Sequence, residues 1–475
     1  MEIYIKRGSD LVMPEKSARY KQSWLSAWRI YTKPEAVRMF FLGFSSGLPL
    51  LLVLGTLSFW LREAGVELST IGMVTWVGLA YGFKWAWAPL VDRLQLPLLT
   101  AKLGRRRSWL LFSQCVIACS LLLMGFTDPK DHLSTMIALT TLTAFASATQ
   151  DIALDAYRIE SAEPSEQAAL AATYQTGYRL AMIWAGAGAL ALAAYFSDAE
   201  LLYDHFAWQA AYSVMAFSML IGIIAVMVSP EPQRQIERKI SDLTQQRLQS
   251  CQQKHPFWSE RRVRLSVWFY EAACLPFLDF FTRYRWQAAV ILLLIATYRI
   301  SDVVMGVMAN PFYQDLGFTK EEVAAVSKVF GVVMTLMGAF IGGVVSTRIG
   351  VMKTLFLGGL LSALTNLLFS WLALQGHHVP YLVLTVSADN LAAGIASVAF
   401  LAYLSGLTNT AYTATQYALF SSIMLLLPKF LAGFSGFVVE SVGYSAFFIG
   451  TALIGIPVLI LVVWASFLSH SAIEH

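Results

Sequence analysis

Charged side chains are scarce in this chain of 475 residues. Asp, Glu, Lys and Arg make up 13% of it, whereas soluble globular domains carry about 25%. A water-soluble fold could not cover its surface with so little charge. Together with a hydrophobic content of 57% and a mean hydropathy of +0.58, this composition predicts an integral membrane protein.

Other scarcities exclude further classes of protein. Four cysteines are too few to stabilise a chain of this length through disulfide bonds, and 31 glycines and 15 prolines are too few for a collagen-like or disordered protein. The net charge of +4 is small, so we expect no nucleic-acid partner. No HExxH, GxSxG or GxxxxGK(S/T) pattern occurs, so we expect neither an enzyme nor an ATP-driven pump. His377 and His378 have no further ligand at zinc spacing, and we expect no metal and no cofactor.

Twelve apolar runs are long enough to cross a hydrocarbon core of about 30 Å. They predict an all-α membrane protein with helices near 39–61, 69–91, 108–126, 133–156, 168–196, 208–229, 286–308, 322–346, 354–376, 380–405, 413–437 and 444–468. The sequence therefore predicts an N-terminal segment (1–38), a six-helix half (39–229), a central loop (230–285), a second six-helix half (286–468) and a tail (469–475). Paired six-helix halves are typical of secondary transporters.

Basic side chains are distributed unevenly between the two sides of this layout. The turns on the side of the N-terminal segment carry 26 Lys and Arg, and the opposite turns carry only Arg62, Lys130 and Lys320. Because Lys and Arg favour the cytoplasmic side, both termini are predicted to be cytoplasmic. Two apolar stretches on that side, KQSWLSAWRIY and RVRLSVWFYEAACLPFLDFF, could lie on the inner leaflet or pack against the bundle.

Charged residues inside the predicted spans indicate a polar interior. A charge at the bilayer centre costs about 2.5 to 3.5 kcal/mol, so each needs a partner or a wet cavity. The charged residues inside the spans are Lys84, Asp151, Asp155, Arg179, Arg299, Asp302, Lys328, Asp389 and Lys429. The third, sixth, ninth and twelfth spans carry none, as expected if every third helix faces lipid and the others surround a polar cavity.

Asp151 and Asp155 share one face of the fourth predicted helix with Ser147 and Arg158. Two carboxylates there could load and release a proton, although Asp155 could simply pair with Arg158. Arg179 in the fifth span could bind an anionic substrate through its fork of donors, or pair with Asp151.

The second half offers similar alternatives. Asp302 could pair with Lys328 or with Arg299, and Asp389, next to Asn390, is a further candidate for proton binding. In the first half, Lys84 could equally extend along its own helix to the interface.

Small and aromatic residues in the first two spans are the remaining candidates. Ser45 and Ser46 lie in GFSSGLPL, where small residues allow close helix contact or expose backbone to a ligand. Trp76 and Trp85 could stack on a sugar ring, whereas the tryptophans near them are more typical of the membrane interface.

A series of motifs, in chain order, resembles the AmpG family of muropeptide permeases. They are GFSSGLPL, AYGFKWAWAPLVDR, GRRRSWLL, SATQDIALDAYR, GYRLAM, YRISD, DNLAAGIASVAF and TATQYALFS, and they span residues 43 to about 425. Asp92, Arg93 and the run from Gly104 to Arg107 also resemble the GxxxDRxGRR loop of the major facilitator superfamily, here interrupted by QLPLLTAKL. Asp389 departs from the Glu expected there in enteric members.

The resemblance implies a major facilitator fold and proton-driven import of N-acetylglucosaminyl-1,6-anhydro-N-acetylmuramyl peptides across the bacterial inner membrane. By analogy we also expect a monomer. The expected proton-coupling residues are Asp151, Asp155, Asp302 and Asp389. The expected substrate-binding residues are Ser45, Ser46, Trp76, Lys84, Gln150, Arg179, Arg299, Lys328, Asn390 and Gln416. The expected gating residues are Asp92, Arg93, Arg105, Arg106 and Arg158. The alternative is a related permease for another amphiphilic solute, such as a siderophore or an acetyl-CoA-like molecule.

Overall fold

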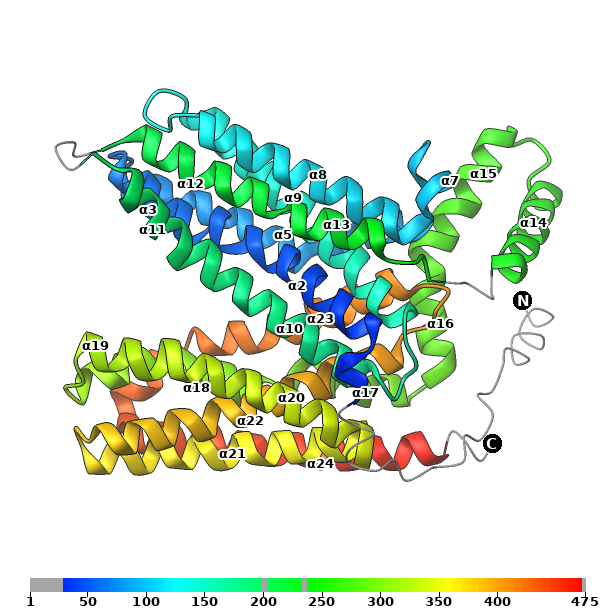
Figure 1. Ribbon diagram of the computed structural model, residues 1–475. Coiled ribbons are helices and arrows are strands. Elements are labelled where there is room, and N and C mark those ends of the chain that lie inside the picture. Colours follow the sequence, from blue (N-terminus) through cyan, green and yellow to red (C-terminus); the bar gives the residue numbers. More distant parts are fainter. Residues whose placement is uncertain (1–28, 199–202, 233–236, 472–475) are drawn as a thin grey trace.

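The computed structural model describes residues 29–198, 203–232 and 237–471, and within these ranges it contains helices and no strand (Figure 1). Eleven helical segments there are long and apolar enough to cross a membrane. In the first half they are built from α2 (Pro34–Val53), α3 (Gly55–Glu63), α8 (Arg105–Phe126), α9 (Leu133–Glu160), α10 (Gln167–Ile183), η4 (Trp184–Gly188), α11 (Ala189–Phe196), α12 (His205–Ser218) and α13 (Leu220–Val228). In the second half they are built from α17 (Gln287–Thr297), α18 (Ile300–Asp315), η6 (Ala324–Phe330), α20 (Gly331–Ile349), α21 (Val351–Gln375), α22 (Val379–Leu407), α23 (Thr413–Ala432) and α24 (Ser435–Ser471).

The span expected at 69–91 is helical but is not one continuous helix. It consists of α4 (Leu68–Val74), η2 (Thr75–Gly78), α5 (Leu79–Phe83), η3 (Lys84–Ala86) and α6 (Ala88–Arg93). Gly78 and Gly82 are poor helix formers, and Pro89 supplies no N–H for the helix ladder. Hydropathy predicts the length of this span correctly, but it does not report where the backbone breaks.

The end expected at 437 lies too late, whereas the start expected at 444 coincides with a bend in the structure. Helix α23 ends at Ala432, and α24 begins at Ser435 but bends at Gly443, which has a φ of 78°. Glycine accepts this left-handed conformation without steric cost, so the bend falls where the sequence has no side chain.

The two halves meet at one end of the bundle and diverge toward the other (Figure 1). Helix α10 of the first half packs against α20 and α22, and α23 of the second half packs against α5, η3, α6 and α9. We call the end at which α6 meets the start of α23 the basic end, because it carries Arg93, Arg105 and Arg106. At the opposite end, α3 and α11 lie apart from α18 and α19 (Lys320–Val323).

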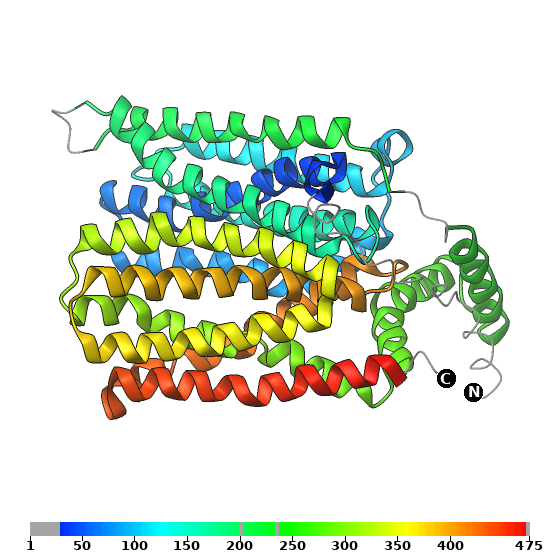
Figure 2. The ribbon, with the colours of Figure 1, turned by 60° about the horizontal axis from the view of Figure 1, so that its bottom comes forward.

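The central segment forms a layer across the basic end (Figure 2). It contains α14 (Glu237–Lys254), α15 (Glu260–Phe269), η5 (Tyr270–Cys274) and α16 (Leu275–Tyr284). Phe280 of α16 is buried among side chains of α17, α22 and α23, whereas Phe281 is 49% exposed. This segment therefore packs against the bundle, one of the two arrangements that its apolar sequence allows.

The described part of the N-terminal segment also contacts the bundle. Tyr31 lies in η1 (Arg29–Thr32), and its hydroxyl donates a hydrogen bond of 2.8 Å to the carbonyl of Phe340 in α20. The residues before Arg29 lie outside the described ranges.

Candidate functional site

The close approach of α2 and α10 shapes the interior of the first half. A Cβ on Gly43 would lie 2.2 Å from the carbonyl oxygen of Tyr174, and one on Gly47 would lie 2.3 Å from that of Tyr178. Because only glycine fits at these contacts, the small residues of GFSSGLPL serve helix packing. They also bring Ser46 of α2 up to α9.

Asp151 lies at the junction of α2, α9 and α10. The hydroxyl of Ser46 donates a hydrogen bond of 2.5 Å to its Oδ1, and the hydroxyl of Tyr174 lies 3.4 Å from the same serine. Asp151 is 8% exposed. The expected ion pair with Arg179 is not among the contacts of the described residues, so a serine rather than a cation holds this carboxylate.

Ser45 and Gln150 form a second network, which is closed within the first half. Nε2 of Gln150 and Nε2 of Gln114 both donate to the Ser45 hydroxyl, at 2.8 and 3.0 Å. All three side chains are fully buried. Gln114 lies in the third span, which has no charged residue. A search for charged residues inside the spans therefore does not find it.

Asp155 bridges two cations from different helices. Its Oδ2 lies 3.6 Å from Nζ of Lys84, and its Oδ1 lies 3.7 Å from Nη2 of Arg158. Lys84 is 9% exposed and therefore points into the protein rather than extending to the interface. The expected pairing of Asp155 with Arg158 is present, with Lys84 as an additional partner.

Arg158 connects the two halves. Its Nη1 donates to the Ser405 hydroxyl of α22 at 3.1 Å, and its guanidinium lies 5.3 Å from the centre of the Tyr417 ring in α23. The side chain is fully buried. It therefore lies where a cation would lock the halves together.

Arg179 and Arg299 are different, because no ion pair or hydrogen bond of either side chain occurs within the described ranges. Both are partly buried, one in α10 of the first half and the other just before α18 of the second. Their positive charges are close enough to repel each other. The charge of Asp302 lies within range of Arg299, but no carboxylate lies within ion-pair distance of either guanidinium among the described residues, so the two cations can accept an additional anion.

The carboxylates of the second half lie near these arginines. Asp302 lines a cavity of about 10 Å³ with Tyr298 and Ser362, which is room for about one water molecule. Asp389 accepts a hydrogen bond of 3.2 Å from Thr365, and its charge lies within range of Asp302.

The two remaining candidates of this half are less involved with these carboxylates. The Asn390 amide instead accepts a hydrogen bond of 2.8 Å from Thr335. Lys328 lies in η6, and its side chain lies outside the described part of the structure.

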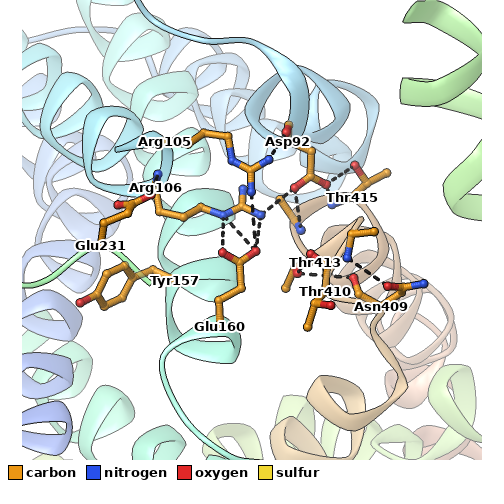
Figure 3. A network of polar contacts seen from close by, with 12 residues as sticks. Asp92, Arg105, Arg106, Tyr157, Glu160, Glu231, Asn409, Thr410, Thr413 and Thr415 are labelled. Carbon is orange, nitrogen blue, oxygen red and sulfur yellow. Dashed lines mark hydrogen bonds and ion pairs between the residues drawn. The ribbon is translucent and has the colours of Figure 1, made fainter. Parts of the chain in front are cut away.

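At the basic end, Asp92 joins the halves directly (Figure 3). Its Oδ2 accepts from the backbone N–H and hydroxyl of Thr415 at 2.7 and 2.6 Å, and its Oδ1 accepts from Arg106 at 2.8 Å. Thr415 lies in the first turn of α23, where unpaired N–H groups favour a negative charge. Arg106 in turn pairs with Glu160 at 2.6 Å.

Asp92 lies just beyond the expected span 69–91. Burial would raise its pKa, but the guanidinium groups of Arg106 and Arg105 and the hydrogen bond from Thr415 outweigh burial and hold the pKa below its ordinary value. The cationic neighbours therefore favour the ionised form of this carboxylate.

Other expected gating residues extend this cluster. Arg105 donates to the backbone carbonyl of Asp92 at 2.5 Å. Arg93 lies 3.4 Å from the buried carboxylate of Glu271 in η5 and 5.4 Å from the ring centre of Tyr412. Glu160 and Glu271 are not among the site residues expected from the sequence. Acidic residues in turns that are otherwise rich in Lys and Arg could have indicated ion-pair partners for the gating residues.

Gln416 contacts the central segment, and the two candidate tryptophans are exposed. Gln416 donates to Asp279 and to the carbonyl of Pro276 in α16, at 2.9 and 2.8 Å, so it belongs to the contacts at the basic end. Trp76 is 68% exposed and Trp85 is 36% exposed.

Comparisons with known proteins agree with this architecture. The model of the Major Facilitator Superfamily matches residues 39–302 and 288–475. The anhydromuropeptide permease of Escherichia coli K12 is 33% identical over 434 residues, which cover 91% of this chain and 80% of that protein. A Rickettsia conorii transporter named AmpG 4 is 32% identical over 436 residues, covering 92% and 97%.

Solved structures confirm the expected fold. The fucose:proton symporter FucP of Escherichia coli superposes with a TM-score of 0.62 at 13% identity, covering 94% of this chain and 99% of that one. The proton:xylose symporter XylE superposes with a TM-score of 0.57 at 13% identity, covering 92% and 94%.

Proposed function

The chain belongs to the major facilitator superfamily and, within it, to the AmpG permeases, and from this premise we propose that it imports anhydromuropeptides together with protons. The cargo is N-acetylglucosaminyl-1,6-anhydro-N-acetylmuramic acid with or without its peptide, taken from periplasm to cytoplasm for cell-wall recycling. The protein is a transporter of the bacterial inner membrane, acts as a monomer and needs no cofactor besides the proton. The basic end and both termini face the cytoplasm.

The observation that carries this proposal is the arginine pair. Arg179 and Arg299 come from opposite halves and are partly buried, and neither forms an ion pair within the described ranges, although the charge of Asp302 lies within range of Arg299. Leaving a guanidinium uncompensated inside a membrane protein is costly. A cargo that carries carboxylates on its peptide supplies the missing anion, and it does so between the halves, where transporters of this design bind their substrates.

Carboxylates on both sides of this pair supply candidate proton carriers. Asp151 and Asp155 lie in α9, and Asp302 and Asp389 lie in the second half within range of each other's charge. A proton bound to one of them adds a positive charge to the loaded carrier, and the membrane potential contributes about 2.3 kcal/mol per charge per 100 mV.

The contacts at the basic end support alternating access. Asp92 with Thr415 and Arg158 with Ser405 close the cytoplasmic end, while the halves diverge at the periplasmic end. Cargo enters such a state from the periplasm. Breaking these contacts allows the halves to rock and release the cargo on the other side.

Uptake by proteoliposomes tests the proposal. Labelled anhydromuropeptide should accumulate above its external concentration when the outside is acidic, and a protonophore should abolish this accumulation. Three unlabelled competitors are added separately: the disaccharide without peptide, a siderophore and acetyl-CoA. Uptake that ignores the pH gradient contradicts symport. Competition by the siderophore or acetyl-CoA, but not by the disaccharide, would assign the carrier to another amphiphilic solute.

A further inference from the structure

An apolar cavity of about 220 Å³ lies between the central segment and the second half. Its wall exposes only apolar atoms, and the side chains that form most of it are Phe277, Phe280, Phe281, Leu292, Leu419 and Ile423. Such a cavity does not hold ordered water, because water needs polar partners. Its occupant must therefore be apolar.

The cavity adjoins an apolar face of α23 that becomes exposed further along the helix. Leu419, Ile423, Leu426 and Phe430 follow one another at intervals of four, three and four residues, so they share one helix face. Leu426 is 55% exposed and Phe430 is 66% exposed. Large apolar side chains exposed along a membrane span face acyl chains, and the cavity is the inward end of that face.

The corner between α16 and α17 fixes the depth of the cavity. Arg285 and Trp286 form this corner, and Trp286 is 59% exposed, as expected for a residue at the level of the lipid headgroups. Leu292 lies six residues further along the chain, which is about 9 Å deeper in a helix. The cavity thus begins below the headgroups and extends into the hydrocarbon.

Arg285 supplies a charge at this corner, which lies in the chain between the lining residues Phe281 and Leu292. Its side chain is exposed, and it forms no ion pair or hydrogen bond within the described ranges, whereas its neighbour Arg283 is occupied by Asp279 at 2.9 Å. Its φ of 47° is in the region that favours glycine, so the corner holds an arginine at a position that most side chains avoid. Basic residues at this level bind anionic headgroups of the inner leaflet.

We propose that the cavity binds one acyl chain of an anionic phospholipid from the inner leaflet, with Arg285 holding its phosphate. The bound chain has a mechanical consequence. Thr415 and Gln416 also line the cavity, and these residues hold Asp92 and Asp279. A lipid in the cavity packs against the start of α23 and restricts its movement. It thereby stabilises the hydrogen bonds of Thr415 and Gln416 at the basic end.

Native mass spectrometry of the purified full-length protein tests the site. Phosphatidylglycerol and phosphatidylcholine with identical chains are titrated separately. Wild-type protein should retain one phosphatidylglycerol about fivefold more tightly, the factor that corresponds to about 1 kcal/mol per basic side chain at an anionic surface. Glycerol 3-phosphate, which lacks acyl chains, should not displace it.

Variants distinguish the contribution of the lipid headgroup to binding from that of the acyl chain. Arg285→Gln should remove the preference for phosphatidylglycerol, whereas Arg264→Gln, at an exposed position of α15, should keep it. Ile423→Trp fills the cavity and should reduce binding of both lipids, whereas Leu426→Trp, on the same face outside the cavity, should not. Equal binding of the two lipids by wild-type protein, or equal behaviour of the two Trp variants, overturns the proposal. Arg285 is exposed, so its replacement keeps the test valid even if Ile423→Trp does not fold.

Discussion

Asp92 and Thr415 lie 323 positions apart in the chain, and two hydrogen bonds of 2.7 and 2.6 Å join them across the interface of the two halves. One donor is the backbone N–H of Thr415 and the other is its hydroxyl. The carboxylate therefore closes the basic end through the first turn of a helix as well as through a side chain, and the two donors can be removed separately.

Asp92→Asn should open the basic end. A charge-assisted bond contributes about 2 kcal/mol, so the closed population should fall on the order of 30-fold relative to the open one. Spin labels are attached at the exposed positions Lys102 and Lys353, one in each half. Opening should lengthen the distance between the two labels, measured by electron paramagnetic resonance. Thr415→Val loses the hydroxyl but keeps the N–H, so its effect should be smaller, about fivefold. Asp131→Asn, at an exposed position of the opposite end, is the control, and a shift of equal size there would contradict the assignment.

Arg106→Gln should make this closure sensitive to pH. Burial raises the pKa of Asp92, but Arg106 and Arg105 lower it below its ordinary value of 3.8. A carboxylate with a lowered pKa stabilises the closed state above its ordinary pKa, and this stabilisation is lost as the pH falls through the lowered value. The closed state of the wild-type protein should therefore be constant from neutral pH down to about 4. Without Arg106, burial prevails and closure should fail at a higher pH. The same label distances, measured across a pH series, check this, and identical pH profiles would refute it.

Asp151→Asn should separate coupling from transport. The amide keeps a partner for the Ser46 hydroxyl but cannot bind and release a proton. We expect uphill uptake to disappear while exchange of labelled for unlabelled substrate persists at a similar rate. Ser46→Ala, which removes the hydrogen bond and keeps the carboxylate, should retain uphill uptake. Equal loss of both activities in Asp151→Asn would make this residue structural.

Arg179→Gln and Arg299→Gln should each weaken substrate binding. Loss of a guanidinium that pairs with a carboxylate costs about 1.5 to 3 kcal/mol, which corresponds to roughly 10- to 150-fold in affinity. Because the site is formed by both arginines, the effects should depend on the anionic charge of the ligand: the disaccharide without peptide carries only its lactyl carboxylate and should lose less than the peptide-bearing cargo, which carries several carboxylates. Binding of the disaccharide with and without peptide, measured by calorimetry, provides the comparison. The same loss for both ligands would place the arginines away from the peptide.

Gly43→Ala should destabilise the fold without touching any candidate functional group. The added Cβ would lie 2.2 Å from the carbonyl oxygen of Tyr174, so α2 and α10 must separate. Overpacking of this kind costs about 1 to 3 kcal/mol. Gly406→Ala is the matched control, because nothing lies within 4 Å of its added Cβ. Thermal unfolding in detergent should show a lower midpoint for Gly43→Ala alone.

The sequence predicts the fold well because the bilayer imposes it. A span must be apolar over its whole length and must satisfy its own backbone, so hydropathy locates nearly every helix. The break in the second span escapes this reasoning, since Gly78 and Gly82 lower helix propensity without lowering hydropathy. The bend at Gly443, in contrast, coincides with the start of the last span expected at 444.

The candidate site is only partly predictable. Asp151, Asp155 and Arg179 can be recognised from the sequence as candidate functional residues, because a charged side chain inside a membrane span is costly and is usually kept there for a function. The choice of partner does not follow from the sequence. Asp151 takes Ser46 rather than Arg179, since helix packing brings that hydroxyl within 2.5 Å. Gln416 lies in one of the family motifs, yet its side chain contacts α16. The position of α16 in the central segment cannot be derived from the hydrophobic periodicity of the sequence.

The hydrogen bond from Tyr31 to Phe340 also sets an order of events during synthesis. The two residues are 309 positions apart, and at about 5 to 20 residues per second the ribosome needs roughly 15 to 60 s to make the acceptor after the donor. Throughout that interval the carbonyl of Phe340 does not yet exist, so η1 can contact α2 and α10 of its own half but not α20. The contact between Tyr31 and α20 thus forms only after the first half and the central segment have been synthesised.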